Sequence, residues 1–269
     1  MSYNFKLEQR YEENKNYEVR FKIYLSFFKY LCTLYLIYTR IMSLFTDLHG
    51  LLLPRLCPVC GKLLMEGEDV VCAFCALGLP RFPILKLDDN YLLRTLWNKA
   101  EVRHAFTFLS YNHYSPYHNL IISIKFHGHS DLAIKLGQWA AMEAAKHGFW
   151  DKADALVPVP LTRWRQWQRG YNQAEMLARG MAKVTGLPVL NLLKRTKNRT
   201  PQSRLKGETR LKNADNIYRA YIPDAWRGKT LVLVDDVMTT GATLGSCAQA
   251  LHDADENAEI CIFPLSYAG

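Results

Sequence analysis

The sequence lacks several features that would make its function easy to assign. It has no G-x-x-x-x-G-K-[ST] segment, and therefore no Walker-type phosphate-binding loop. It has no apolar run of about 20 residues, the length that a membrane-spanning helix needs. It also shows no domain with an N-terminal nucleophilic cysteine for glutamine hydrolysis. These absences argue against a Walker-type nucleotidase, a polytopic membrane protein and a glutamine amidotransferase.

The first 41 residues contain no Gly, Ala, Pro, Asp, His or Trp, yet hold seven of the fifteen tyrosines. We interpret residues 1–41 as an atypical extension. It is translated upstream DNA with the true start at Met42, a membrane or interfacial anchor, or a signal peptide. The apolar run 23–38 is short for a span and contains Lys29, and no A-x-A-like cleavage site follows it. We favour the first interpretation, and we expect a cytoplasmic protein with domains at 42–80 and 81–269.

The chain carries more positive than negative charge. Lys and Arg number 34 against 25 Asp and Glu, which gives a formal net charge of +9. Such a balance favours a polyanionic ligand, such as nucleic acid or a phosphorylated metabolite. It is equally compatible with a solvated basic surface.

Four of the seven cysteines lie within 19 residues, in the pattern C-x2-C-x11-C-x2-C. They are Cys57, Cys60, Cys72 and Cys75. Each C-x2-C pair lets two thiolates of one turn reach the same metal, and four thiolates form a closed tetrahedral site for structural Zn²⁺. The alternative is two disulfides, which need an oxidising compartment. We expect a small zinc knuckle.

The rest of the chain alternates between apolar strands and amphipathic helices. Strands are predicted over 102–111, 155–160, 188–195, 229–236 and 259–267. Helices are predicted over 117–128, 131–148, 172–186 and 240–253. This alternation predicts an α/β domain with a mostly parallel sheet covered on both faces. Ligands of such sheets bind at the carboxyl ends of the strands.

The segment LVLVDDVMTTGAT, residues 231–243, combines an apolar strand, two acids and a small hydroxyl-rich turn. Adjacent carboxylates at a strand end are costly unless they are solvated, paired or bound to a cation. Asp235 and Asp236 can accept hydrogen bonds from sugar hydroxyls or help to hold Mg²⁺. The following turn opens a helix whose N-terminus favours an anion.

This segment resembles the phosphoribosyl-pyrophosphate-binding signature of type I phosphoribosyltransferases over all thirteen positions. The resemblance implies the phosphoribosyltransferase fold, with Mg²⁺ bound together with the ligand. It implies that Asp235 and Asp236 contact the ribose hydroxyls. It also implies that the following turn holds the 5′-phosphate. The residues of that turn are Thr239, Thr240, Gly241, Ala242 and Thr243.

A second segment, VPVPLTRWRQWQRGYNQAEMLA at 157–178, is similar to the ComF/GntX group of phosphoribosyltransferase-like proteins. That group also has an N-terminal four-cysteine knuckle and a K-F/Y-x-G stretch, matched here by IKFHG at 124–128. In related enzymes the loop after the first sheet strand holds pyrophosphate. By position this loop is Val159 to Thr162, including Pro160 and Leu161, with Arg163 and Arg169 nearby.

Three functions fit this resemblance. The first is transfer of phosphoribose from phosphoribosyl pyrophosphate to an unknown nitrogen acceptor, with residues 100–130 as candidates for the acceptor-binding region. The basic segment 194–213 would close over the leaving pyrophosphate, or would be a disordered basic loop. The second follows from the group's association with competence and DNA use: binding of single-stranded DNA and of DNA-processing proteins of the uptake machinery. The third is a sensor that binds phosphoribosyl pyrophosphate or a nucleotide without turnover.

The run RWRQWQR, residues 163–169, allows two interpretations. Two tryptophans between three arginines offer stacking faces beside phosphate contacts for single-stranded nucleic acid. Alternatively, Trp164 and Trp167 pack at the edge of the sheet while the arginines hold pyrophosphate. We favour the packing of the tryptophans.

Overall fold

The computed structural model describes residues 35, 54–84, 86–125, 130–196 and 217–269. The chain divides into two units, Met1–Arg55 and Leu56–Gly269, and the account below concerns the second. Apart from Tyr35, the interpreted extension 1–41 lies outside the described residues, as does most of the basic segment 194–213. Among the described residues, no helix combines the length and the apolar character needed to cross a membrane.

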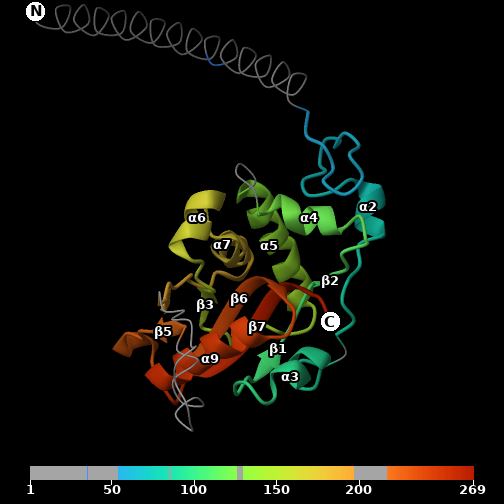
Figure 1. The fold of residues 1–269 in the computed structure, drawn as a ribbon. Helices are drawn as coiled ribbons and strands as arrows, with labels where there is room; N and C mark the ends of the chain where they lie inside the picture. Colours follow the sequence, from blue (N-terminus) through green and yellow to red (C-terminus); the bar gives the residue numbers. More distant parts are fainter. Residues whose placement is uncertain (1–34, 36–53, 85, 126–129, 197–216) are drawn as a thin grey trace, which may run out of the picture. The chain divides into compact units, whose positions relative to one another are not determined.

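A parallel sheet forms the centre of the second unit (Figure 1). Its strand order is β1 (His104–Ala105), β7 (Glu259–Tyr267), β6 (Thr230–Met238) and β3 (Ala155–Pro158), and β2 (Leu109–Ser110) also pairs with β7. All of these pairings are parallel. All four residues of β3 and the first five of β6 are buried, because a parallel sheet is covered on both faces. The predicted α/β architecture is confirmed.

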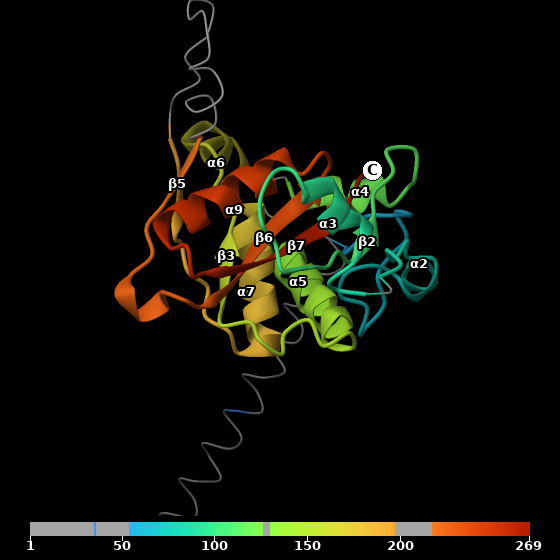
Figure 2. The same cartoon turned by 90° about the horizontal axis from the view of Figure 1, so that it is seen from below.

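Helices cover the two faces of the sheet, with α5 (Ser130–Ala145) and α7 (Gln173–Thr185) on one side (Figures 1 and 2). On the other side lie α9 (Ala242–Ala254) and α3 (Tyr91–Leu96). Side chains of a strand point to alternate faces. Val232 and Val234 of β6 accordingly belong to the buried cluster of α5 and α7, whereas Leu231 and Leu233 belong to that of α3 and α9.

Short elements complete the unit. They are α2 (Ala73–Leu77), α4 (His118–Ser123), α6 (Arg163–Arg169), β4 (Leu193–Arg195), β5 (Tyr218–Ala220) and the 3-10 helix η1 (Asp224–Trp226). The helix α6 was not expected from the sequence. Thr162 begins it by accepting a hydrogen bond from the Arg165 amide, and Gly170 ends it in the left-handed conformation.

Two predicted strands differ from the structure. The strand expected over 102–111 is two short strands, β1 and β2, because their register on β7 places Thr107 opposite Pro264, which has no N–H to donate. The strand expected over 188–195 is not one strand of the main sheet. Val189 forms a single parallel bridge with Leu156, and the chain then leaves the sheet to form β4, which pairs antiparallel with β5.

Candidate functional site

The carboxylates of Asp235 and Asp236 lie near the carboxyl end of β6, where the sheet gives way to a turn. Both are half-buried. The Asp236 amide donates to Asp235 Oδ1 at 2.9 Å, and the Val237 amide donates to Asp236 Oδ1 at 2.7 Å. The Lys125 ammonium, which follows α4, lies 3.5 Å from Asp236 Oδ2. The chain therefore fixes both carboxylates by its own backbone and supplies one counter-charge.

The environment of this pair of acids disfavours the ionised form of Asp235. Burial, and then the negative charge of Asp236, raise the pKa of Asp235 well above its usual range, although the Asp236 amide and Lys125 oppose the shift. A group of this kind gains most from a ligand that brings a cation or hydroxyl donors. The two aspartates thus have the chemistry to bind such a ligand.

The turn from β6 into α9 has the small residues that the motif requires. Gly241 is the N-cap residue of α9 and has a φ of 73°. A Cβ at this position would be strained by the positive φ, and it would lie 2.7 Å from Leu96 Cδ2 and 3.1 Å from Met238 Cε, so the ends of these two side chains would have to shift. Thr239, Thr240, Ala242 and Thr243 are exposed, which leaves the start of α9 open to an anion.

The R-G-Y-N-Q run, residues 169–173, connects α6 to α7 through hydrogen bonds of its own. Asn172 Nδ2 donates to the Val159 carbonyl at 3.0 Å, and Asn172 Oδ1 accepts from the Ala174 amide. The Arg169 guanidinium donates to Oε1 of the buried Gln173 at 2.8 Å. The run thus ties the start of α7 to the end of β3 and fixes the direction of Arg169.

These elements line one polar cavity of about 190 Å³. Its charged residues are Lys125, Arg165, Arg169, Arg195, Asp235 and Asp236. Arg195 of β4 lies over the ring of Tyr218, a β5 residue that also lines the cavity, with 5.5 Å from the guanidinium carbon to the ring centroid. Four cations and two anions therefore surround this space.

The structure brings most of the predicted residues to this cavity. Pro160, Leu161, Arg169, Thr243 and the two aspartates line it. Thr162 instead caps α6, and the remaining turn residues, Thr239 to Ala242, lie beside the cavity without lining it. Arg163 is the first residue of α6, but its side chain is outside the described part of the structure.

Several lining residues were not predicted as site residues. They are Lys125, Arg165, Asn172, Gln173, Arg195 and Tyr218. Most of them lie in segments that the sequence marked as unusual: IKFHG, RWRQWQR, R-G-Y-N-Q and the start of the basic segment. Tyr218 lies in no such segment, because only the pairing of β4 with β5 brings it to the site.

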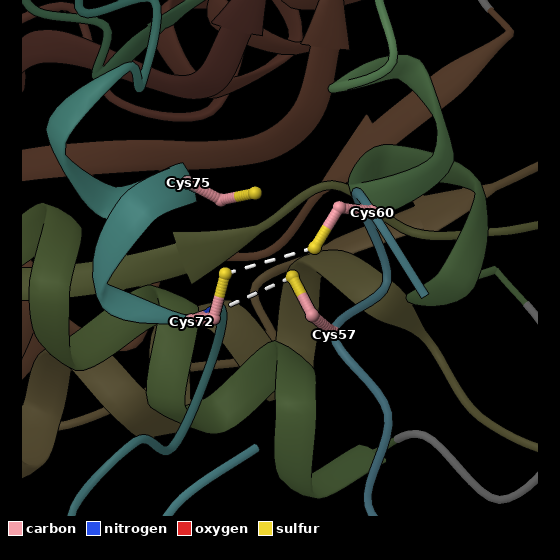
Figure 3. A group of neighbouring side chains, drawn as sticks. All are labelled: Cys57, Cys60, Cys72 and Cys75. Carbon is pink, nitrogen blue, oxygen red and sulfur yellow. Dashed lines mark hydrogen bonds between the residues drawn. The ribbon is translucent and has the colours of Figure 1, made fainter. Parts of the chain in front are cut away.

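The four cysteines of the predicted knuckle converge (Figure 3). Their Sγ atoms all lie within 4.8 Å of one another, and those of Cys60 and Cys72 are 3.6 Å apart. Tetrahedral Zn–S bonds of about 2.3 Å would separate the sulfurs by about 3.8 Å. All four cysteines are free thiols. The cluster could hold a metal ion, and its geometry fits four thiolate ligands better than two disulfides.

The backbone of the knuckle prepares Cys57 as a thiolate. Burial alone would raise its pKa, but hydrogen bonds from the amides of Cys72, Cys60 and Val59 outweigh that effect and lower the pKa to about 7. Gly61, with a φ of 72°, closes the first turn by donating its N–H to the Cys57 carbonyl. A thiolate at neutral pH is what a soft metal requires.

Comparison with known proteins identifies relatives of this chain. Competence protein F of Haemophilus influenzae is 38% identical over 101 residues, which cover 37% of this chain and 44% of that protein. DNA utilization protein YhgH of Salmonella typhimurium is 28% identical over 219 residues, which cover 75% of this chain and 92% of that protein. Competence protein ComFC of Bacillus subtilis is 29% identical over 211 residues, which cover 78% of this chain and 77% of that protein. The chain is thus similar to proteins named for competence and for DNA utilization. No family model matches it.

Two solved structures align with part of this chain. The allosteric regulatory enzyme of purine biosynthesis has a TM-score of 0.33 at 22% identity, over 48% of this chain and 25% of that one. The purine phosphoribosyltransferase of Pyrococcus horikoshii has a TM-score of 0.28 at 18% identity, over 53% of this chain and 84% of that one. The ligand of the candidate site therefore has to follow from the site's own residues.

Proposed function

We propose that this chain binds phosphoribosyl pyrophosphate together with Mg²⁺ in the cavity at the ends of β3 and β6. One observation carries the proposal: the two carboxylates of β6, the open start of α9 and the cations of α6 and β4 meet around one small space. Carboxylates suit vicinal hydroxyls, helix starts suit phosphates, and arginines suit pyrophosphate.

Each group of residues has a separate role in this proposal. Asp235 and Asp236 accept hydrogen bonds from the ribose hydroxyls. The backbone of Thr239 to Thr243 holds the 5′-phosphate. The loop from Pro160 to Thr162, with Arg163 and Arg169, holds the pyrophosphate, and Mg²⁺ neutralises part of its charge. Whether the ligand is consumed in a transfer reaction or sensed without turnover depends on whether an acceptor binds beside it.

We also propose that the four-cysteine cluster holds one structural Zn²⁺. A site with four thiolates has no open position for substrate, so its role is to stabilise the fold. Cys57, Cys72 and the neighbouring Val71 belong to the same buried cluster as Leu136 of α5. Metal binding at the knuckle therefore supports the packing of the domain that carries the ligand site.

The names of the relatives suggest a role in competence and DNA use, which we place in the cytoplasm. The structure contradicts the favoured packing of the two tryptophans: Trp164 is 65% exposed and Trp167 is 81% exposed. Exposed indole rings on a helix that also carries arginines favour a second candidate function, the binding of single-stranded DNA by α6. DNA-processing partners remain part of this second candidate.

Calorimetry with the full-length, zinc-loaded protein tests the first function. Phosphoribosyl pyrophosphate should bind with Mg²⁺ and bind much more weakly without it. The variant Asp235→Asn/Asp236→Asn should lose this binding while keeping its circular dichroism spectrum. The matched control is Asp253→Asn. Asp253 is an exposed residue of α9, and its carboxylate accepts a hydrogen bond from the Gln249 side chain. Absence of binding to the folded wild type would reject the proposal.

Salt titration tests the second function. Binding of an oligo-dT probe, followed by fluorescence anisotropy, should weaken steeply with salt and should be reduced in Trp164→Ala/Trp167→Ala. The same variant should bind phosphoribosyl pyrophosphate normally, since neither tryptophan lines the cavity. Unchanged oligo-dT affinity in that variant would exclude α6 as the DNA-binding element.

A further inference from the structure

A second cavity, of about 400 Å³, lies beside α3 and has no role in the functions proposed so far. Its lining comes from the two residues before the N-cap of α3, from α3 with its C-cap Trp97, and from segment 100–102. It shares no lining residue with the proposed ligand cavity. Figures 1 and 2 both draw α3 apart from α6, the helix of the second candidate function. This cavity is therefore a separate feature of the molecule.

The floor of the α3 cavity is apolar and is fixed by the core. Leu93, Ala100 and Val102 line the cavity and pack against the buried cluster of α3 and α9. The buried Asn90 holds the preceding loop in place. Its Nδ2 donates to the Ala105 carbonyl at 2.8 Å, and its Oδ1 accepts from the Leu93 amide at 3.2 Å. The cavity is thus formed by the packing of the chain itself.

The charged residues of the α3 cavity are mostly acidic, although the whole chain has a formal net charge of +9. Three carboxylates, those of Asp88, Asp89 and Glu101, line it together with one guanidinium, that of Arg94. Arg94 donates from Nε and Nη2 to Asp89 Oδ1 at 3.2 and 2.9 Å, so this cation is already paired. Among the residues that the structure describes, Asp88 and Glu101 have no salt bridge. The cavity therefore offers two uncompensated negative charges.

An exposed indole ring completes the lining. Trp97 is 81% exposed, and Tyr91 of the same helix is 59% exposed. An indole face attracts cations, and arginine most often. The long stem of an arginine or lysine side chain covers apolar surface while its charged head stays at the carboxylates. The apolar floor, the free carboxylates and the indole therefore match one chemistry, that of a basic side chain.

Other ligand classes fit the α3 cavity less well. Its net negative charge repels phosphates, which disfavours nucleotides and nucleic acid. Within the described residues, the four cysteines are the one group of three or more ligand atoms close enough to share a metal ion, and the cavity acids are not among them. A small free amine would leave the exposed rings of α3 uncovered. Trp, Tyr and Arg are the side chains that contribute most to protein interfaces, so a protein segment accounts for the rings as well as for the charges.

We propose that the α3 cavity is a docking site for a partner protein and that it takes a segment of that partner bearing arginine side chains. A guanidinium lies against the indole of Trp97 and pairs with the carboxylates of Asp88 and Glu101. This inference goes beyond the proposed function and does not depend on it. Since the two cavities share no residue, the partner can dock whether or not the cavity at the ends of β3 and β6 is occupied.

Fluorescence anisotropy with the full-length, zinc-loaded protein tests the docking site. The probes are three fluorescein-labelled octapeptides, in which alanine alternates with arginine, with lysine or with glutamate. Asp88→Asn/Glu101→Gln removes the two unpaired carboxylates, and Trp97→Ala removes the indole. In parallel, the indole ¹⁵N–H resonance of Trp97, assigned with the Trp97→Ala variant, reports whether a peptide reaches the cavity.

Each variant has a matched control. Glu66→Gln/Asp224→Asn removes two exposed carboxylates that line neither cavity. Tyr221→Ala removes an exposed ring that also lies outside both cavities. All of the substituted side chains are exposed, so every variant should keep the Tm of the wild type.

We expect the arginine peptide to bind and to shift the Trp97 resonance, the lysine peptide to bind more weakly, and the glutamate peptide not to bind. Both cavity variants should weaken binding of the arginine peptide about tenfold, whereas the two controls should not. The inference is overturned if the arginine peptide does not bind the wild type, or if either cavity variant keeps the wild-type affinity.

Two further results would reject a partner protein as the occupant. Spermidine that shifts the Trp97 resonance at a lower concentration than the arginine peptide would make the ligand a small amine. Self-association in sedimentation velocity that Trp97→Ala abolishes would make the occupant a second copy of this chain. We expect neither result.

Discussion

The ammonium of Lys125 lies 3.5 Å from the carboxylate of Asp236, and this contact joins α4 to the end of β6. Both side chains are partly buried, with 27% and 18% of their surface exposed. The contact supplies positive charge beside two adjacent aspartates, and all three residues line the cavity.

Lys125→Met should lower the free energy of unfolding by about 1–2 kcal/mol at pH 7, because two partly buried carboxylates lose a counter-charge. The loss should shrink as the pH falls, because Asp235, whose pKa is raised by burial and by the charge of Asp236, takes up a proton. Lys135→Met is the control: its ammonium pairs with the exposed Asp69, a contact expected to contribute about 0–1 kcal/mol. Urea unfolding of both variants at pH 7 and pH 4 measures the difference. Equal losses at pH 7 would contradict the prediction.

Asp235→Asn should stabilise the ligand-free protein. Burial and the charge of Asp236 raise the pKa of Asp235 in the folded state. The unfolded chain therefore gives up this proton first as the pH rises. The contribution of Asp235 to stability is therefore greatest below its pKa in the unfolded chain, which is about 4. It falls as the pH rises, until the pH passes the pKa of Asp235 in the folded protein. Asparagine avoids this loss and keeps the oxygen that accepts from the Asp236 amide.

A rise in Tm of roughly 2–4 °C at pH 7 is expected, the shift that about 1 kcal/mol causes in a domain of this size. At pH 3 the two proteins should melt together. Binding of phosphoribosyl pyrophosphate should be lost in the same variant, an exchange of stability for function. A lower Tm at pH 7 would show that the carboxylate of Asp235 stabilises the free protein.

Gly241→Ala should cost more stability than Gly186→Ala. The two glycines have nearly the same φ, 73° and 74°, so the conformational cost of a Cβ is similar, at about 1 kcal/mol. Only at Gly241 does the new Cβ meet other atoms, since nothing lies within 4 Å at Gly186. We expect a total of about 2–3 kcal/mol for Gly241→Ala, measured by denaturant unfolding. Equal costs would mean that Leu96 and Met238 move aside freely.

Metal analysis of the purified protein should find one zinc per chain. Cys60→Ser and Cys75→Ser should lose it, whereas Cys247→Ala, a buried cysteine of α9, should retain it. Chelation should lower the Tm of the whole second unit, because knuckle residues share a buried cluster with α5. Zinc should also be released as the pH falls, since its ligands must be thiolates. Full zinc content in Cys60→Ser would reject the four-thiolate site.

Much of the sheet could be predicted because burial on both faces leaves a direct signature. The strands β3, β6 and β7 are continuous apolar runs, and α5, α7 and α9 have clear helical spacing. The aspartate pair was identified because charges at the end of a buried strand are unusual. These signals are local, so a single window of sequence contains them.

The features that escaped prediction depend on contacts between distant segments. Tyr218 reaches the cavity only through the pairing of β4 with β5. Asn90 begins α3 and donates to the Ala105 carbonyl, 15 residues away, and no local pattern marks it. The Tyr111–His118 contact depends on where the turn between β2 and α4 places two residues seven apart. The exposure of Trp164 and Trp167 likewise follows from α6, whose arginine and tryptophan content gave no apolar face to detect.

A crystal structure of the full chain with phosphoribosyl pyrophosphate and Mg²⁺ tests the central claim most directly. The account predicts ribose hydroxyls within hydrogen-bond distance of Asp235 and Asp236, the 5′-phosphate on the backbone of Thr239 to Thr243, and pyrophosphate beside Arg169. Ligand density elsewhere on the molecule, or a 5′-phosphate away from the start of α9, would contradict it.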